Sequence, residues 1–273
     1  MESDPRNAAI VLRQDVSEHL SVLRVQPDWG DVPAFEPGQF AMLGLPRAVP
    51  VRAGDGGPAG RTRPAARMRM VRRPYSIASS ARERAWAEFC LVRVPQGKLT
   101  EPLWEIGEGG RIWMDESIRG EFTLDLAPVG ADLVLVATGT GIGPFASMLR
   151  TYRGQGRWRR LVLIHGVRRV RDLVYREELE RASAEDGTIA YLPVVSREPE
   201  ESGWSGLRGR VQQVLEGETW QRLLVDPLDP ERAHVLLCGN PDMIRSLSSI
   251  LVECGFTPST RTERGNLHYE RYW

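Results

Sequence analysis

The 273-residue sequence has a single lysine, only three cysteines and no long apolar run. The cysteines (Cys90, Cys238 and Cys254) form no Cys-X-X-Cys pair. Their spacing excludes a disulfide framework, a cysteine-only iron–sulfur cluster and a conventional zinc site, and it favours a reducing cytoplasm. No stretch of about 18 apolar residues occurs, so no transmembrane helix is predicted. The polar residues 1–6 do not resemble a secretion signal.

Net charge is also lacking, because Lys+Arg and Asp+Glu both number 36 and the formal charge is +0. A nucleic-acid partner is therefore not indicated. The charge is unevenly distributed, however: eight arginines and one acid, Asp55, lie between Arg47 and Arg73. The Pro, Gly and Arg content of residues 47–72, without an apolar period, predicts a mobile surface loop. Such a segment is either solvated without a role or an electrostatic landing surface for an acidic partner.

The first half of the chain is rich in short β-type segments separated by turn residues. Strands are expected at 8–12, 19–25, 40–45, 75–78, 87–94, 111–114 and 121–124, with a short helix at 99–105. Several short strands with turn-rich connections favour an antiparallel β-barrel. This predicts a first domain over residues 1–127.

The second half alternates apolar strands with amphipathic helices. Strands are expected at 133–137, 161–165, 189–195 and 233–238, and helices at 144–152, 174–184 and 242–254. This alternation is typical of a parallel α/β sheet. It predicts a second, nucleotide-binding domain over residues 128–273.

A glycine-rich turn, Thr138-Gly139-Thr140-Gly141-Ile142-Gly143-Pro144, links the strand at 133–137 to the helix at 144–152. Glycines let the backbone approach a pyrophosphate, and a helix N-terminus offers N–H groups and the positive end of its dipole. The spacing differs from Gly-X-Gly-X-X-Gly. The turn therefore indicates a nucleotide site without excluding a plain tight turn.

A second motif, Arg73-Pro74-Tyr75-Ser76, places a cation, an aromatic ring and a hydroxyl on one extended strand. These groups suit a flavin nucleotide: arginine pairs with phosphate, tyrosine lies against the ring system and serine hydrogen-bonds a ring nitrogen. A tyrosine in a strand is also commonly an ordinary packing residue, so this motif alone does not decide between a flavin site and simple packing.

Both motifs occur in order between Phe35-Glu36-Pro37-Gly38-Gln39-Phe40 and Cys238-Gly239-Asn240-Pro241, and the chain ends in Glu270-Arg271-Tyr272-Trp273. With these motifs the chain resembles the ferredoxin–NADP reductase family, in particular bacterial ferredoxin/flavodoxin–NADP reductases that end in an aromatic pair. The resemblance extends from about residue 35 to residue 273. Residues 47–72 depart from it and look like an insertion in a loop that the bacterial members keep short.

The resemblance implies an FAD site in the first domain and at its border with the second. The residues that it assigns to FAD are Arg73, Pro74, Tyr75, Ser76, Cys90, Leu91, Val92, Gly97, Lys98, Leu99, Thr100, Thr140, Tyr272 and Trp273. Within this set, 97–100 match a phosphate-holding turn, and Tyr272 and Trp273 match aromatic residues that cover the flavin.

The resemblance also implies an NADP(H) site. The residues assigned to it are Gly139, Gly141, Val167, Arg168, Ser196, Arg197, Arg210, Cys238, Gly239 and Asn240. Arg168, Arg197 and Arg210 match positions around the adenosine 2′-phosphate. Arginine pairs with phosphate, whereas NAD sites place an acid on the ribose, so NADP is favoured. Ser76, as a hydrogen-bond partner of the flavin, and Cys238, packed against the nicotinamide, are the expected catalytic residues.

The implied activity is hydride exchange between FAD and NADP(H), coupled to single-electron exchange with ferredoxin or flavodoxin as a transient, acidic carrier. One alternative is a flavin reductase subunit that serves an oxygenase or haem protein, and another is a nucleotide-binding regulatory module without turnover. His165 lacks an acid or serine companion, which argues against a hydrolase, and the other histidines form no metal pattern, so no metal is predicted. The choice of carrier, the electron direction and the oligomeric state stay open at this point.

Overall fold

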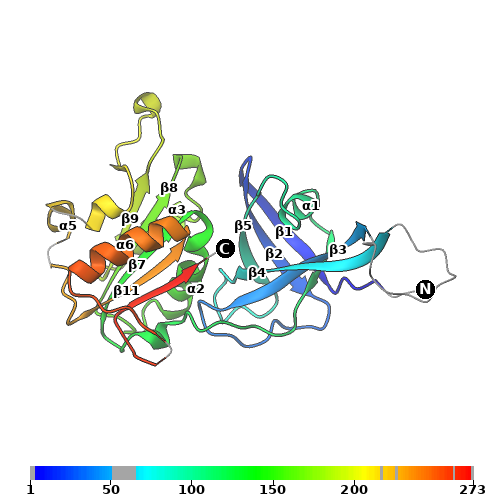
Figure 1. Cartoon of the computed structure of the whole chain (residues 1–273), viewed down its shortest axis with the longest axis horizontal. Helices are drawn as coiled ribbons and strands as arrows, with labels where there is room; N and C mark the ends of the chain where they lie inside the picture. The colour runs from blue at the N-terminus through cyan, green and yellow to red at the C-terminus, as the bar shows by residue number, and fades with distance from the viewer. Residues whose placement is uncertain (1–3, 51–65, 216–217, 225–226, 261, 272–273) are drawn as a thin grey trace.

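The computed structural model describes residues 4–50, 66–215, 218–224, 227–260 and 262–271. It contains two six-stranded sheets, one in each half of the chain, which lie side by side (Figure 1). The predicted division at 127/128 lies in the connection between these sheets. Within the described ranges, no helix has the length and apolar character needed to span a membrane.

The first sheet is antiparallel, as predicted, with the strand order β4-β3-β6-β1-β2-β5. Its elements are β1 (Ala8–Ser17), β2 (Leu20–Pro27), β3 (Phe40–Pro50), β4 (Ala66–Ser76), β5 (Ala87–Val92), α1 (Thr100–Trp104) and β6 (Arg111–Met114). An isolated bridge between Ile77 and Phe89 links the edges β4 and β5 and closes the sheet into a barrel. The barrel surrounds buried side chains such as Ile10, Leu43 and Phe89.

The prediction of a strand at 121–124 is wrong. Residues Leu124–Leu126 form a 3-10 turn, η1, and the Thr123 N–H donates to the Glu121 carbonyl 3.0 Å away. This local bond replaces the ladder bonds that a strand would need. The segment therefore connects the domains instead of extending the barrel.

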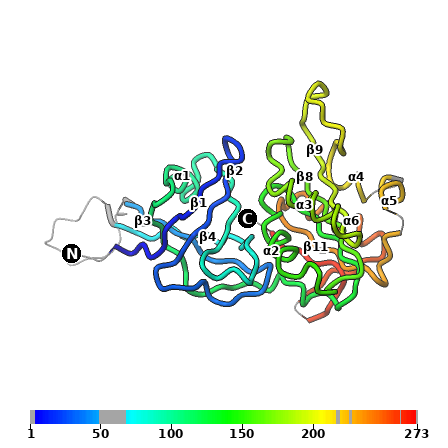
Figure 2. The backbone as a smooth tube through the Cα atoms, turned by 180° about the vertical axis from the view of Figure 1, so that it is seen from behind, coloured from blue at the N-terminus to red at the C-terminus, as the bar shows by residue number. Residues whose placement is uncertain are grey.

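The loop predicted over 47–72 is also corrected. β3 and β4 pair in unbroken register from Phe40 with Ser76 to Pro50 with Ala66, and Arg47 lies opposite Arg69. The outer part of this hairpin projects from the barrel on the side away from the α/β half (Figures 1 and 2). Arg47, Ala48, Met68 and Arg69 of this outer part are exposed. Strand residues without a buried face need no apolar alternation, which explains why the sequence pattern did not show the arm. The remainder of the predicted loop, 51–65, lies outside the described residues.

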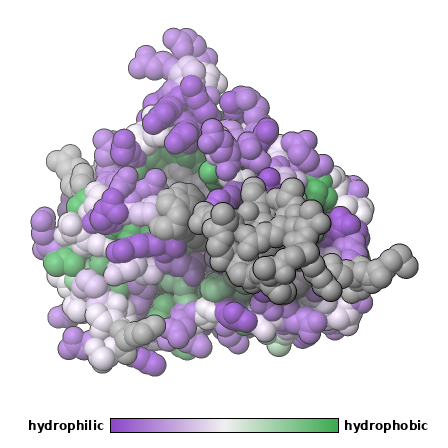
Figure 3. Space-filling view, turned by 45° about the vertical axis from the view of Figure 1, so that its right-hand side comes forward, coloured by the Kyte–Doolittle hydropathy of each residue, from purple (hydrophilic) through white to green (hydrophobic). Residues whose placement is uncertain are grey.

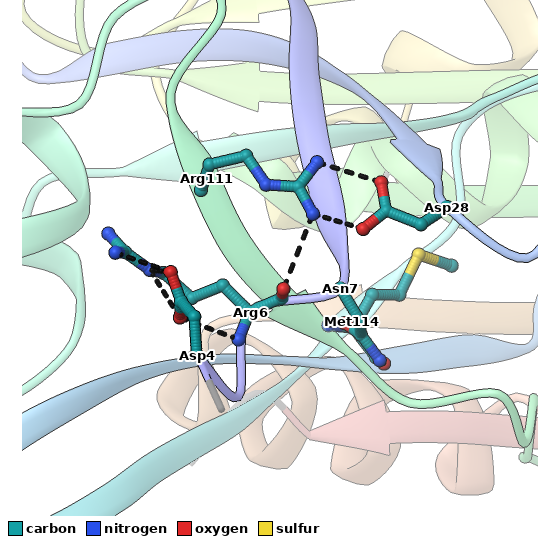
Figure 4. A network of polar contacts seen from close by, with 6 residues as sticks. All are labelled: Asp4, Arg6, Asn7, Asp28, Arg111 and Met114. Atoms are coloured by element: carbon teal, nitrogen blue, oxygen red, sulfur yellow. Dashed lines mark hydrogen bonds and ion pairs between the residues drawn. The ribbon is translucent and has the colours of Figure 1, made fainter. Parts of the chain in front are cut away.

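The N-terminal segment is tied to β6 by polar contacts (Figure 4). The Asn7 side chain donates to the Met114 carbonyl at 3.0 Å and accepts from the Met114 N–H at 2.8 Å. Arg111 pairs with Asp28 and donates to the Arg6 carbonyl at 3.3 Å. These bonds hold the start of β1 in register with the strand that connects to the second half.

The second sheet is entirely parallel, again as predicted, with the order β10-β9-β8-β7-β11-β12. Its strands are β7 (Asp132–Thr138), β8 (Arg160–Val167), β9 (Ile189–Val195), β10 (Leu207–Arg208), β11 (Ala233–Gly239) and β12 (Leu267–Arg271). Its helices are α2 (Ile142–Tyr152), α3 (Arg176–Glu185), α4 (Gln212–Leu215), α5 (Glu218–Leu223) and α6 (Pro241–Glu253). Apolar side chains of α2 and α3 cover one face, and those of α4, α5 and α6 cover the other.

The barrel packs against the α2 face of the parallel sheet through a shared apolar core. Val22 and Cys90 from the barrel belong to the same buried cluster as Phe145 of α2. At the edge of this core, Arg150 of α2 donates to Glu88 of β5 at 2.7 Å and to the Ala78 carbonyl at 2.8 Å. Arg150 thereby connects the two domains.

Glu88 is the buried centre of the Arg150 network, in which Arg24 and Glu178 are partly exposed. Glu88 has a side chain only 3% exposed and also accepts from Arg24 at 2.9 Å, while Arg150 forms two bonds to Glu178 of α3. Burial raises the pKa of Glu88, but Arg150 and Arg24 more than offset this effect and hold it below its usual value. Glu88 is therefore an ionised, buried carboxylate that depends on its arginine partners.

Replacing Arg150 with leucine is expected to lower the free energy of unfolding by about 2–4 kcal/mol, because Glu88 would lose one of its charge partners. The matched control is Arg245→Leu, which removes an exposed pair with Asp242 and should cost less than about 1 kcal/mol. Urea unfolding followed by tryptophan fluorescence measures both. Equal stability losses in the two variants would contradict a clamp role for Arg150.

Candidate functional site

Three residues from distant parts of the sequence meet where the barrel touches the carboxyl ends of the parallel strands. Cys238 of β11 and Glu270 of β12 are register partners in neighbouring strands. The Ser76 hydroxyl, at the end of β4, donates to Glu270 Oε2 at 3.3 Å. The structure therefore brings the two predicted catalytic residues, Ser76 and Cys238, to one place through Glu270.

Glu270 is the site residue that the sequence analysis did not select. Burial raises its pKa to about 7, although the hydrogen bond from Ser76 acts in the opposite direction. A carboxyl group that titrates near neutral pH at a domain interface is suited to holding or releasing a proton. The only available signal was its place two residues before the terminal Tyr272-Trp273 pair, which does not reveal its partner.

The glycine-rich turn packs tightly against the end of β11. A Cβ at Gly141 would lie 2.3 Å from the Cys238 carbonyl oxygen, and one at Gly239 would lie 2.5 Å from Thr138 Oγ1. The Asn240 N–H donates to that same Thr138 hydroxyl oxygen at 3.0 Å. Gly141 and Gly239 are therefore required for this close approach of the turn to β11, and their role in NADP(H) binding stays a prediction.

Gly139 has a different environment within the same turn. It has a φ of +55°, in the left-handed region, and among the described residues beyond its two chain neighbours no heavy atom lies within 4 Å of a Cβ placed there. The turn runs through the 3-10 segment η2 (Gly139–Gly141) directly into α2. An open glycine backbone at a helix start is a suitable approach for a phosphate.

The three arginines expected around a 2′-phosphate lie at the carboxyl ends of adjacent strands. Arg168 follows β8, Arg197 follows β9 and Arg210 follows β10, and all three are exposed. The Arg197 N–H donates to the Arg168 carbonyl at 2.9 Å, so these two positions are neighbours. None of the three is in an ion pair within the described part of the chain. They form a cationic edge suited to a dianion.

The acid next to these arginines, Glu198, is engaged by the backbone of another segment. Glu198 Oε2 accepts the backbone N–H of Val170 at 2.8 Å, at the start of the 3-10 segment η3 (Val170–Asp172). Val167 and Ser196, predicted for the same site, are joined by a backbone bond of 3.0 Å. Hydrophilic residues cover the part of the molecule between β9 and β10 that projects at the top of Figures 1 and 3.

The residues predicted for FAD in the barrel lie on β4 and β5. Arg73 is exposed, and its guanidinium donates to the Arg72 carbonyl at 2.7 Å. Tyr75 is half-buried against the barrel core, and burial raises its pKa to about 12. Cys90 is buried in the interface between the domains, and burial raises the pKa of its thiol far above the ordinary value. This thiol is therefore an inert packing group.

The predicted phosphate turn at 97–100 is a tight bend before α1. The Gly97 N–H donates to the Val94 carbonyl at 2.8 Å, and a Cβ at Gly97 would lie 2.2 Å from Thr100 Oγ1. Lys98 is exposed, and its carbonyl accepts from Arg47 of the β3–β4 arm at 2.9 Å. The arm therefore reaches the turn. Tyr272 and Trp273, the predicted cover of the flavin, lie outside the described residues.

The family model of the oxidoreductase NAD-binding domain matches residues 135–249. The chain is 33% identical over 207 residues to a flavodoxin/ferredoxin–NADP reductase from Escherichia coli K12, covering 74% of this chain and 81% of that protein. It is 30% identical over 247 residues to a ferredoxin–NADP reductase from Pseudomonas aeruginosa, covering 87% and 86%. A ferredoxin NADP⁺ reductase from Neisseria gonorrhoeae, solved with bound FAD and NADP, superimposes over 100% of both chains with a TM-score of 0.80 at 24% identity.

The fold and site define a two-domain oxidoreductase in which a β-barrel faces a parallel nucleotide-binding sheet. The chain belongs to the flavodoxin/ferredoxin–NADP reductase family. The resemblance inferred from the sequence motifs is therefore confirmed, as are the fold class and the enzyme class. The roles of the individual site residues stay predictions.

Proposed function

We propose that this chain binds FAD and NADP(H), exchanges a hydride between them, and exchanges single electrons with a small acidic carrier, ferredoxin or flavodoxin. The observation that carries this proposal is the meeting of Ser76, Glu270 and Cys238 at the domain interface. Family membership supports the reaction class. The open backbone at Gly139 and the exposed Arg73 fit the phosphates of such cofactors.

FAD, when bound, accepts hydride and releases electrons one at a time. A hydride that leaves as two single electrons leaves one proton behind. The ionised carboxylate of Glu270 can accept that proton through the Ser76 hydroxyl, because Ser76 Oγ already donates to Glu270 Oε2. Cys238, on the neighbouring strand, is placed to pack against the nicotinamide and orient it. Orientation by such fixed groups supplies the acceleration without a covalent intermediate.

The cofactor content of the purified protein tests the proposal. Bound FAD, visible as flavin absorbance, and reduction of that absorbance by NADPH are the expected results. A colourless protein that gains no flavin on reconstitution would support the alternative of a regulatory nucleotide-binding module. Turnover with a haem protein or oxygenase but not with ferredoxin or flavodoxin would support the alternative of a flavin reductase subunit. The cytoplasmic location stays a prediction.

The positive charge on the β3–β4 arm is evidence for an acidic carrier as the partner. Arg47 and Arg69 face each other across the arm, both are exposed, and Lys98 lies beside Arg47. Arg72 and Arg73 continue the positive charge along β4 towards Ser76. A local positive potential that leads to the proposed flavin site can raise the association rate of an acidic carrier although the net charge of the chain is +0.

Replacing Arg47 and Arg69 together with serine is expected to lower the second-order rate of carrier reduction about three- to tenfold at low salt, and to flatten its dependence on ionic strength. The control variant, Arg181→Ser with Arg222→Ser, removes the same charge from exposed positions on α3 and α5. Stopped-flow measurements with ferredoxin and flavodoxin provide the rates, and a small neutral dye should be reduced normally by all variants. An unchanged rate and salt dependence in the arm variant would remove the landing-surface role.

A further inference from the structure

His165 lies beneath the glycine-rich turn and has no solvent exposure. It is part of β8, where its register partners are Ala137 of β7 and Pro193 of β9. Its position near the carboxyl end of β8 places the ring under η2. No catalytic or binding role for His165 was predicted from the sequence.

Both ring nitrogens of His165 have hydrogen-bond partners. Nε2 lies 3.2 Å from the Gly139 carbonyl oxygen, and Nδ1 lies 3.3 Å from the Tyr191 hydroxyl. A carbonyl oxygen only accepts, so Nε2 must carry the hydrogen. Burial lowers the pKa of His165 to about 4, so the ring is neutral at pH 7 and Nδ1 accepts from Tyr191. The two partners together select one tautomer.

The Gly139 carbonyl is held from two sides. It accepts the Ile142 N–H within η2 as well as the hydrogen of His165 Nε2. Because the peptide unit is planar and trans, the N–H of Thr140 points opposite to the Gly139 carbonyl. Fixing that carbonyl towards His165 therefore fixes the N–H edge of the same peptide on the other side of the turn. Gly139 needs such support because a glycine can adopt many backbone conformations besides the observed one, in which φ is +55°.

We propose that His165 is a positioning residue for the nucleotide: its neutral ring donates from Nε2 to Gly139 and fixes the peptide plane that the NADP(H) phosphates approach. Tyr191 assists by holding Nδ1 as the acceptor. This inference rests on the proposed function to the extent that the turn binds NADP(H). A histidine that only fills the core would make the same two bonds to satisfy its buried nitrogens. Replacing it would then lower the stability of the fold without changing the affinity of the folded protein for NADP⁺.

Two variants of similar polarity separate these roles. Glutamine places its amide nitrogen near the position of Nε2, whereas asparagine reaches only to that of Nδ1. His165→Asn is therefore expected to weaken NADP⁺ binding to the FAD-loaded protein about tenfold, the value of one lost hydrogen bond, and His165→Gln by less than about threefold. Difference absorbance of the flavin during NADP⁺ titration measures the affinities. The kcat with saturating NADPH should change less than KM in both variants.

A second measurement, on the wild-type protein, observes the tautomer of His165 directly. Nitrogen-15 NMR of the histidine rings at pH 7 is expected to show His165 as the neutral Nε2–H tautomer, with its signals assigned by their loss in His165→Gln. An Nδ1–H tautomer, or a protonated ring, would overturn the inference. Equal affinities of the Asn and Gln variants for NADP⁺, with normal binding by the wild type, would also overturn it. No NADP⁺ binding by the wild-type protein would instead overturn the proposed function and, with it, the nucleotide role of His165.

Discussion

Replacing Glu270 with glutamine is expected to lower electron delivery to a one-electron acceptor about a hundredfold, the usual size of a lost acid–base group. Each hydride divided into two single electrons leaves a proton, and Glu270 is placed to receive it from Ser76. Its pKa of about 7 means that the ionised, proton-accepting form is depleted as the pH falls below 7. The wild-type rate should therefore decrease from pH 8 to pH 6, and the variant should show a low rate without this dependence.

Steady-state ferricyanide reduction with saturating NADPH, measured between pH 5.5 and 8.5, provides the profile. Glu263→Gln is the matched control, because it removes an exposed carboxylate before β12. Reduction of the bound flavin by NADPH in a single turnover should change less than the ferricyanide rate, since hydride transfer itself releases no proton. A Glu270→Gln enzyme that retained the wild-type rate and pH profile would remove Glu270 from the mechanism.

Glu270 also illustrates which features of the site could not be predicted from the sequence. Its importance depends on the register of β12 beside β11 and on the contact with the end of β4, which lies 194 residues earlier in the chain. Neither relation is encoded in a local pattern. Ser76 and Cys238 were selected because the resemblance assigns each of them a role. Glu270 lies in the terminal segment Glu270-Arg271-Tyr272-Trp273, where the resemblance assigns roles only to the two aromatic residues.

The buried strands were the most predictable elements. β9 agrees with its predicted range, 189–195, because a continuous apolar run bounded by polar residues is typical of a strand covered on both faces. β6 likewise agrees with the range 111–114. Short elements such as β10, α4 and α5 were not predicted, since two to six residues carry too little periodicity to detect. Tertiary packing, not local preference, determines them.

The β3–β4 arm was mispredicted for a different reason. Its outer residues pair with each other through backbone bonds, while arginines such as Arg47 and Arg69 remain in solvent. Composition therefore indicated a loop where the ladder continues. The positive charge is present in either conformation, and the hairpin places Arg47 and Arg69 opposite each other in register. Arginines held in register by paired strands form a better-defined docking surface than arginines on a loop would.

Cofactor preference should depend most strongly on the cationic edge at the ends of β8 and β9. Replacing Arg197 with alanine is expected to raise KM for NADPH more than tenfold, since a charge-assisted bond is worth about 1.5–3 kcal/mol. Replacing Arg168 as well should bring the loss to at least about a hundredfold if the two bonds act independently. KM for NADH should be nearly unchanged in both variants, because NADH lacks the 2′-phosphate.

Arg208 provides a control on the neighbouring strand β10. Its guanidinium donates to the carbonyls of Glu198, Pro199 and Trp204, so it supports the β9–β10 connection and is not free to pair with a phosphate. Arg208→Ala should therefore change the KM values for NADPH and NADH by the same factor. Parallel kinetics with the two nucleotides measure the ratio. Equal losses with both nucleotides in Arg197→Ala would place the 2′-phosphate elsewhere, because only a contact to that group distinguishes NADPH from NADH.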